Sequence, residues 1–284
     1  MNEKESFSIY FRGGKKVFTS PQVMGILNVT PDSFFDGSRK QTEKEIAERS
    51  NAIISEGGSI IDVGAFSTRP GAQEVSEAEE MRRLRFALGI VRREQPDAIL
   101  SVDTFRPDVA RMVVEEYGAD IINDVSEGGI TGIVDTPLEG THDDIPEIFR
   151  MVAQLKVPYI LMSVKPTMDT MKSALRKEIA LLHDMGHDDI IIDPGYGFGK
   201  SIEQNYEVLA RQEELRELGF PLLIGVSRKR LIWQTLGTSA REALNGTTAV
   251  NIMALERGGD ILRVHDVREA AEAITIYKQL KNIL

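Results

Sequence analysis

The sequence alternates eight short apolar runs with longer segments of helical spacing. The apolar runs, rich in β-branched residues, lie at 23–29, 59–64, 98–103, 120–125, 158–162, 189–194, 221–227 and 260–266. Each run is almost continuously hydrophobic, which is typical of strands buried on both faces in a parallel sheet. The segments between them, such as 43–57 and 79–94, have the apolar spacing of helices. The pattern therefore predicts an α/β protein with a parallel sheet covered by helices.

Eight strand–helix units in roughly 260 residues favour a (β/α)8 TIM barrel. The alternative is a doubly wound open sheet, whose dinucleotide-binding form carries GxGxxG after the first strand. Here that turn reads "NVTPDSF". No low-complexity linker interrupts the alternation, so residues 1–284 are predicted to form a single domain. Residues 1–20 are predicted to add a short N-terminal hairpin that turns at Gly13-Gly14 and covers one end of the barrel.

Composition and charge narrow the classes of partner. The net charge of −10 makes nucleic acid an unexpected partner, because nucleic-acid binding usually needs a basic face. There is no cysteine, which excludes disulfides and thiolate metal sites and fits a reducing compartment. No apolar run approaches the ~20 residues of a membrane helix, and the first residues do not resemble a signal peptide. We therefore expect a cytoplasmic protein that does not act on a membrane.

Polar side chains stand at the ends of most predicted strands. In a TIM barrel the carboxyl ends of the strands and the loops after them build the active site. The residues at these ends are Asn28, Asp103, Asn123, Asp193, Lys229, Arg263, His265 and Asp266. A helix N-cap is an alternative role for the acidic and amide residues, and we favour it for Asp266. It does not apply to Lys229, Arg263 or His265, which are not capping types.

The chemistry of these side chains suggests a ligand with two parts. Asp103, Asn123 and Asp193 suit a flat heterocycle rich in N–H donors, because their oxygens accept in-plane hydrogen bonds. Asn28, Arg263 and His265 come from the first and last strands, which are neighbours in a closed barrel. An amide, a guanidinium and an imidazole together suit an anion, most naturally phosphate. Lys229 is able to serve either part.

Seven segments, in this order and spacing, resemble the dihydropteroate synthase family. They are "NVTPDSFFDG", "STRPGA", "SVDTFRPDVA", "INDVS", "DPGYGFGK", "GVSRK" and "RVHDV", and they cover about residues 22–280. The resemblance implies a TIM barrel and the Mg2+-dependent condensation of 6-hydroxymethyl-7,8-dihydropterin pyrophosphate with p-aminobenzoate. That reaction releases pyrophosphate in folate biosynthesis and is the target of sulfonamides. The resemblance also implies a homodimer that contacts its copy through outer helices near the C-terminal part of the barrel.

The family's residue roles fall on matching positions of this chain. The resemblance implies a pterin pocket of Asp103, Asn123, Met162, Asp193, Gly225 and Lys229. It implies a pyrophosphate site of Asn28, Arg69, Arg263 and His265, with Asn28 also a ligand of Mg2+. It implies a p-aminobenzoate site of Phe34, Thr68, Arg69, Pro70, Phe198, Ser227 and Lys229. Catalytic roles are implied for Asp103 and Lys229 and, in the first loop, for Asp32 and Phe34.

The chain also departs from the family pattern. After the fifth strand the family usually carries Met-His, and here Ser163 takes the place of the histidine. Glu127 stands beside the usual pair of glycines.

Two alternative functions would use the same barrel: a pterin-binding methyltransferase domain and a non-catalytic pterin-binding paralogue. The segment "DPGYGFGKS" nearly forms a phosphate-binding P-loop, but Pro194 occupies the position of the first glycine and has no N–H to offer.

Overall fold

The structure is a computed structural model that describes residues 6–29, 39–66, 75–128 and 145–283. Its centre is an eight-stranded parallel sheet with the order β8-β7-β6-β5-β4-β3-β10-β9. The strands are β3 (Gln22–Asn28), β4 (Ile60–Gly64), β5 (Ile99–Asp103), β6 (Ile121–Asp124), β7 (Tyr159–Met162), β8 (Ile190–Asp193), β9 (Leu223–Ile224) and β10 (Ile261–Val264). A parallel bridge between Ile192 and Leu222 joins the two outer strands of this order. The sheet thus closes into the predicted TIM barrel.

The predicted strands form where expected, with one large difference in length. Strands β4 to β8 are almost completely buried, as their continuous hydrophobicity predicts. The run at 221–227 was predicted as a full strand, but β9 contains only Leu223 and Ile224. The chain leaves the sheet at Gly225, so the residues from Val226 onward turn toward the barrel mouth instead of extending the strand.

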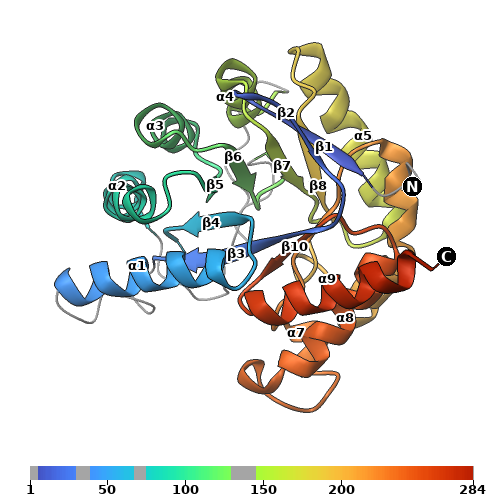
Figure 1. Cartoon of the computed structure of the whole chain (residues 1–284). Helices are drawn as coiled ribbons and strands as arrows, with labels where there is room; N and C mark the ends of the chain where they lie inside the picture. The colour runs from blue at the N-terminus through green and yellow to red at the C-terminus, as the bar shows by residue number, and fades with distance from the viewer. Residues whose placement is uncertain (1–5, 30–38, 67–74, 129–144, 284) are drawn as a thin grey trace.

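Helices surround the strands and bury their outward faces (Figure 1). They are α1 (Arg39–Ser55), α2 (Glu77–Glu94), α3 (Pro107–Tyr117), α4 (Glu147–Leu155), α5 (Met168–Asp184), α6 (Ile202–Ala210), α7 (Arg230–Trp233), α8 (Leu244–Glu256) and α9 (Val267–Lys281), with 3-10 helices η3 (Gln212–Leu218) and η4 (Ala240–Glu242). Local sequence fixes several ends. Ser76 caps α2 by accepting the N–H of Glu79, and α3 starts at Pro107 and stops at left-handed Gly118. None of the helices in the described ranges is long and apolar enough to cross a membrane.

The N-terminal hairpin closes one end of the barrel. Strands β1 (Phe7–Phe11) and β2 (Gly14–Phe18) pair in antiparallel register around a turn at Arg12-Gly13, one residue earlier than predicted, and Gly14 follows it at a φ of 114°. In Figure 1 the hairpin crosses the strands. Its buried side chains Phe7, Ile9 and Phe18 pack on a cluster near the amino ends of all eight barrel strands, namely Met24, Ile60, Ile99, Ile121, Ile160, Ile191, Leu223 and Ile261. The carboxyl end of the barrel is left for the site.

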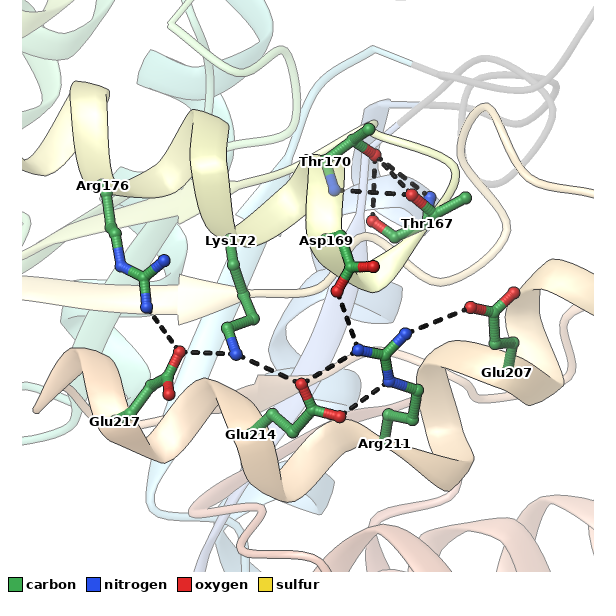
Figure 2. Close-up of polar contacts among 9 residues, drawn as sticks. All are labelled: Thr167, Asp169, Thr170, Lys172, Arg176, Glu207, Arg211, Glu214 and Glu217. Carbon is green, nitrogen blue, oxygen red and sulfur yellow. Dashed lines mark hydrogen bonds and ion pairs between the residues drawn. The ribbon is translucent and has the colours of Figure 1, made fainter.

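A network of ion pairs joins the helices on either side of β8 (Figure 2). Arg211 contacts Asp169 of α5 at 2.8 Å and Glu214 of η3 at 2.7 Å. Lys172 of α5 contacts Glu214 at 3.1 Å and Glu217 at 2.6 Å. Single exposed ion pairs contribute little, but charges shared among several partners hold one geometry better. The network therefore fixes α5 against η3, and with them the outer support of β8.

Candidate active site

The register of the parallel strands brings the predicted polar residues to one rim. Asn28 pairs with Gly64, Gly64 with Asp103, and Asp103 with Asn123 across four neighbouring strands. On the other side, Met162 pairs with Asp193. The prediction that strand ends assemble these residues is therefore confirmed for the geometry of the rim.

The centre of the site is an arginine between two carboxylates. Arg263 on β10 donates from Nη2 to Asp103 Oδ2 at 2.8 Å and from Nε to Asp62 Oδ2 at 2.7 Å. Asp62 is fully buried and also accepts the Ser101 hydroxyl at 2.6 Å and the Asn123 amide at 3.2 Å. Sequence reasoning missed Asp62, because it considered only the last residue of each run. An aspartate inside the apolar run 59–64 was a usable signal.

Two buried acceptors at the mouth have no partner within the described part of the chain. They are Asp103 Oδ1 and Asn123 Oδ1. Buried polar atoms in proteins are normally hydrogen-bonded, and an exception calls for an explanation such as a ligand. Both atoms accept hydrogen bonds, so a ligand that fits them carries N–H or O–H donors.

Burial shifts the pKa of the ionisable groups at the mouth. It raises the pKa of Asp103 to about 7, against the opposing effect of Arg263 and with a further increase from Asp62. It also raises the pKa of Asp193, which Lys229 partly opposes. For Lys229 itself, burial lowers the pKa to about 8, although the charge of Asp193 acts in the other direction. The mouth thus holds an acid, Asp103, and a base, Lys229, with pKa values near neutral pH, as functional sites often do.

The loop after β8 cradles Lys229. Its ammonium donates to the carbonyl of Tyr196 and lies 4.5 Å from the centroid of the Phe198 ring. Gly197 permits this approach, because a Cβ there would lie 3.1 Å from Lys229 Cδ. A Cβ on Gly225 would lie 3.7 Å from Lys229 Nζ and 4.0 Å from Asp193 Oδ2. Position 225 therefore lies beside both the ammonium and the carboxylate, and a glycine places no side chain there.

The turn after β9 is fixed to the end of β10. Ser227 Oγ lies 3.1 Å from His265 Nδ1 and accepts the His265 backbone N–H at 3.2 Å. Arg228, at a φ of 54°, makes two 2.8 Å hydrogen bonds to the Asp266 carboxylate. Asp266 occupies the N-cap position of α9, but its side chain makes no cap bond there, so the expected capping role is wrong. Its carboxylate is used to hold the turn that carries Lys229.

Comparisons with known proteins agree with this arrangement. The sequence matches the family described as "Pterin binding enzyme" over residues 24–265. A dihydropteroate synthase of Streptococcus pyogenes is 37% identical over 267 residues, 91% of this chain and 95% of that protein. The chain belongs to the dihydropteroate synthase family of pterin-binding enzymes.

Solved structures of the family have the same fold. The Xanthomonas albilineans dihydropteroate synthase with 4-aminobenzoic acid has a TM-score of 0.84 and 35% identity, covering 96% of this chain and 98% of that one. The Coxiella burnetii dihydropteroate synthase in complex with pteroic acid has a TM-score of 0.81 and 31% identity, covering 98% and 100%. These similarities confirm the family resemblance and the TIM barrel.

Some residues expected from the dihydropteroate synthase pattern lie outside the described ranges. These are Asp32, Phe34, Thr68, Arg69 and Pro70. Their roles stay predictions. The residues that the structure does bring together at the mouth are Asn28, Asp103, Asn123, Met162, Asp193, Phe198, Gly225, Ser227, Lys229, Arg263 and His265.

The two residues that depart from the dihydropteroate synthase pattern, Glu127 and Ser163, contact each other. Glu127 is fully buried, at a φ of 56°; it accepts the Ser163 hydroxyl at 2.9 Å and pairs with Lys165 at 3.2 Å. Burial, reinforced by the charge of Glu127, raises the pKa of nearby Glu178 to about 8. This chain thus joins its β6 and β7 loops with a charged contact that involves both unusual residues.

The lysine of the near P-loop segment does not face a phosphate site. Lys200 is buried, and its ammonium donates to the carbonyls of Ser163, Gly195 and Phe198 at 3.0–3.1 Å. Those three contacts use the donors of the ammonium. Lys200 therefore stabilises the β8 loop around Lys229.

Proposed function

We propose that the chain catalyses the dihydropteroate synthase reaction. It condenses 6-hydroxymethyl-7,8-dihydropterin pyrophosphate with p-aminobenzoate to give 7,8-dihydropteroate and pyrophosphate. The observation that carries the proposal is the pair of unpartnered buried acceptors, Asp103 Oδ1 and Asn123 Oδ1, beside the Lys229 ammonium and the Arg263 guanidinium. Support also comes from relatives 35–37% identical over more than nine-tenths of the chain that carry this name.

The pterin ring occupies the mouth between β5, β6 and β8. Its N–H groups donate to Asp103 Oδ1 and Asn123 Oδ1, while Asp193 and Lys229 both lie beside Gly225. A site built to accept a ligand's N–H groups discriminates against ligands that lack them, since its buried acceptors would then stay unpaired. This pairing gives the site its preference for a pterin.

The pyrophosphate group lies toward β3 and β10. Arg263 uses Nε and Nη2 in its contacts with the two carboxylates, and a guanidinium has five N–H donors, so further donors face the leaving group. His265 is held by Ser227 at the neighbouring strand end. Loss of pyrophosphate leaves positive charge on the pterin, which the Asp103 carboxylate stabilises. Catalysis is then electrostatic preorganisation rather than attack by a protein nucleophile.

We extend the proposal to Mg2+ at the leaving group. A Cβ on Gly64 would lie 3.3 Å from Asn28 Oδ1 and 3.7 Å from Asp103 Oδ2, so the glycine leaves room beside the Asn28 oxygen. The described residues contain no cluster of three acidic or histidine ligands. An isolated oxygen ligand fits Mg2+, which usually binds through one or two protein oxygens, water and substrate phosphates. When bound, the ion neutralises charge that develops on the pyrophosphate.

The deciding experiment is product formation from the two substrates with Mg2+. Release of pyrophosphate together with 7,8-dihydropteroate supports the proposal. A protein that binds the pterin substrate but releases no pyrophosphate would be a non-catalytic paralogue. Methyl transfer from a methylated tetrahydrofolate, without use of p-aminobenzoate, would indicate the methyltransferase alternative. A sulfonamide that raises the KM for p-aminobenzoate, and not that for the pterin substrate, would place the inhibitor in the p-aminobenzoate site.

We further propose that the enzyme acts as a homodimer in the cytoplasm. Support for a dimer comes from the C-terminal part of the barrel, where Met253 on the apolar helix α8 is 48% exposed and Leu236, next to Gly246 of that helix, is 56% exposed. Large apolar side chains that gather on a surface favour an interface. Light scattering after size exclusion tests this: Met253→Glu combined with Leu236→Glu should shift a dimer to monomer. A monomeric wild type would contradict it.

A further inference from the structure

Asp62 lies beneath the mouth and contacts residues from three other strands. It is fully buried on β4, two residues before the rim residue Gly64. It accepts hydrogen bonds from Ser101 on β5, Asn123 on β6 and Arg263 on β10. A buried carboxylate is tolerated only when its charge and lone pairs are satisfied, and these contacts do so. Asp62 is thus a buried carboxylate whose hydrogen bonds connect three other strands.

The first consequence concerns the orientation of the Asn123 amide. The two ends of an amide side chain have similar shapes, and its orientation follows from its hydrogen-bond partners. A carboxylate only accepts, so Asp62 requires Nδ2 on its side, with contacts of 3.3 and 3.2 Å to the two oxygens. Asn123 Oδ1 must then face the other way, where it is the unpartnered acceptor of the mouth.

The second consequence concerns the plane of the Arg263 guanidinium. Contacts of 2.7 Å to Asp62 and 2.8 Å to Asp103 hold two different nitrogens of one rigid group. Fixing two points of a planar fork fixes the direction of its remaining donors. Asp103 alone would leave the guanidinium free to rotate about that contact.

We propose that Asp62 is a positioning residue of the reaction, which sets the acceptor face of Asn123 for the pterin ring and the donor face of Arg263 for the pyrophosphate. It acts through these two side chains and touches no substrate. The proposal rests on the proposed function, since it assigns Asn123 and Arg263 their substrates. It predicts that Asp62 affects the pterin substrate and not p-aminobenzoate.

The test replaces Asp62 with an asparagine of the same size. Asp62→Asn removes the charge that pairs with Arg263 and lets the Asn123 amide turn over. A hydrogen bond to a charged group is commonly worth a tenfold effect or more. We expect the KM for the pterin pyrophosphate to rise about tenfold or more and kcat to fall, with the KM for p-aminobenzoate changed less than about twofold. An unchanged pterin KM and kcat in a folded variant would overturn the proposal.

A matched control separates positioning from general destabilisation. Asp120 also pairs with an arginine, Arg92 at 3.1 Å, and accepts the N–H of Leu100 on β5 at 2.9 Å, but it precedes β6 and lies at the other end of the barrel. Asp120→Asn should lower the midpoint of thermal unfolding and leave both KM values unchanged. If it raises the pterin KM as much as Asp62→Asn does, the effect is structural and the proposal is wrong.

A double-mutant cycle tests the route through Asn123. If Asp62 acts partly by orienting this amide, the combined loss in Asp62→Asn with Asn123→Ala should be smaller than the product of the single losses. If the loss in the double variant equals the product of the two single losses, Asp62 does not act through Asn123. Should Asp62→Asn not fold, Ser101→Ala loosens the same carboxylate and is expected to raise the pterin KM two- to fivefold; no change would overturn the proposal.

Failure of the proposed function gives a different result. In that case the wild type itself releases no pyrophosphate. Binding of pteroic acid, followed by fluorescence titration of wild type and Asp62→Asn, then tests the positioning of Asn123 without any turnover. Equal affinities would overturn the role of Asp62, and a weaker variant would support it.

Discussion

Arg263 donates to only one oxygen of Asp103, Oδ2, at 2.8 Å. The other oxygen, Oδ1, is buried and has no partner among the described residues. One carboxylate thereby contacts the Arg263 guanidinium through one oxygen and keeps the other for the ligand that we propose. This geometry places negative charge where the proposed reaction develops positive charge.

Replacing Asp103 should impair the chemical step more than binding. Asp103→Asn keeps the size of the side chain and removes its charge, so we expect kcat to fall well over tenfold, roughly a hundredfold, as for loss of one preorganised electrostatic group. Pyrophosphate release under saturating substrates measures it. Glu115→Gln, on the exposed face of α3, is the control and should not change kcat. Wild-type turnover in Asp103→Asn would show that Asp103 has no catalytic role.

Replacing Lys229 should weaken the use of both substrates, measured as kcat/KM. Its ammonium lies between the Tyr196 carbonyl, the Phe198 ring and Asp193. Lys229→Ala leaves that carboxylate without its cation, and we expect kcat/KM to fall by more than about tenfold. The neighbouring exposed Arg230, changed to alanine, provides a control for loss of positive charge near the mouth. Equal effects of the two substitutions would mean that only net charge matters.

The dependence of kcat/KM on pH should be a narrow bell. The reaction needs Asp103 charged, and because its pKa is raised to about 7 the rate should increase as pH rises through that value. It needs Lys229 protonated, and because its pKa is lowered to about 8 the rate should decrease above that value. In Asp103→Asn the acidic limb should disappear while the basic limb remains. A flat profile from pH 6 to 9 would contradict both assignments.

Stability should decrease as pH rises because of Glu178. Burial and Glu127 raise its pKa in the folded protein to about 8, above the value of an unfolded glutamate. Between pH ~4 and about 8 the folded state therefore holds a proton on Glu178 that the unfolded state has lost. The contribution of this proton to the free energy of unfolding is complete below pH ~4 and is lost as pH rises through about 8. Glu178→Gln should be more stable than wild type at pH 9, by at least ~1 kcal/mol in urea unfolding, and much closer to it at pH 5. A difference that does not change with pH would contradict this.

The Arg228–Asp266 pair should support activity from outside the mouth. It holds the turn that carries Ser227 and Lys229, through two 2.8 Å contacts. Asp266→Asn weakens those contacts, and we expect kcat/KM to fall about fivefold, since misplaced catalytic groups lose rate steeply. The exposed pair of Arg85 and Glu116 provides a control: Glu116→Gln should leave kcat/KM unchanged. Identical behaviour of the two variants would show that the turn does not depend on the pair.

Strand ends were predictable from the sequence, and long-range partners were not. Asn28, Asp103, Asn123 and Asp193 meet at the rim because the carboxyl ends of parallel strands share one edge. Asp62 lies inside an apolar run, and its role depends on Arg263, 201 residues later. Glu80 shows the same limit: by sequence it belongs to an outer helix, yet it is fully buried and accepts the Thr104 hydroxyl at 2.7 Å. An aspartate inside an apolar run marks an unusual residue, but its partners depend on the closed barrel and no local pattern names them.

The hairpin covers the amino end of the barrel strands, so in the described part of the chain the carboxyl end is left for access to the site. Phe7, Ile9 and Phe18 pack over the amino ends of the barrel strands, and Asp103 lies at the opposite end, where β5 finishes. Whatever binds there enters and leaves past the same strand ends. In the proposed function the pterin contacts Asp103 and Asn123 at the strand ends and p-aminobenzoate binds outside it, so we expect the pterin substrate to bind first.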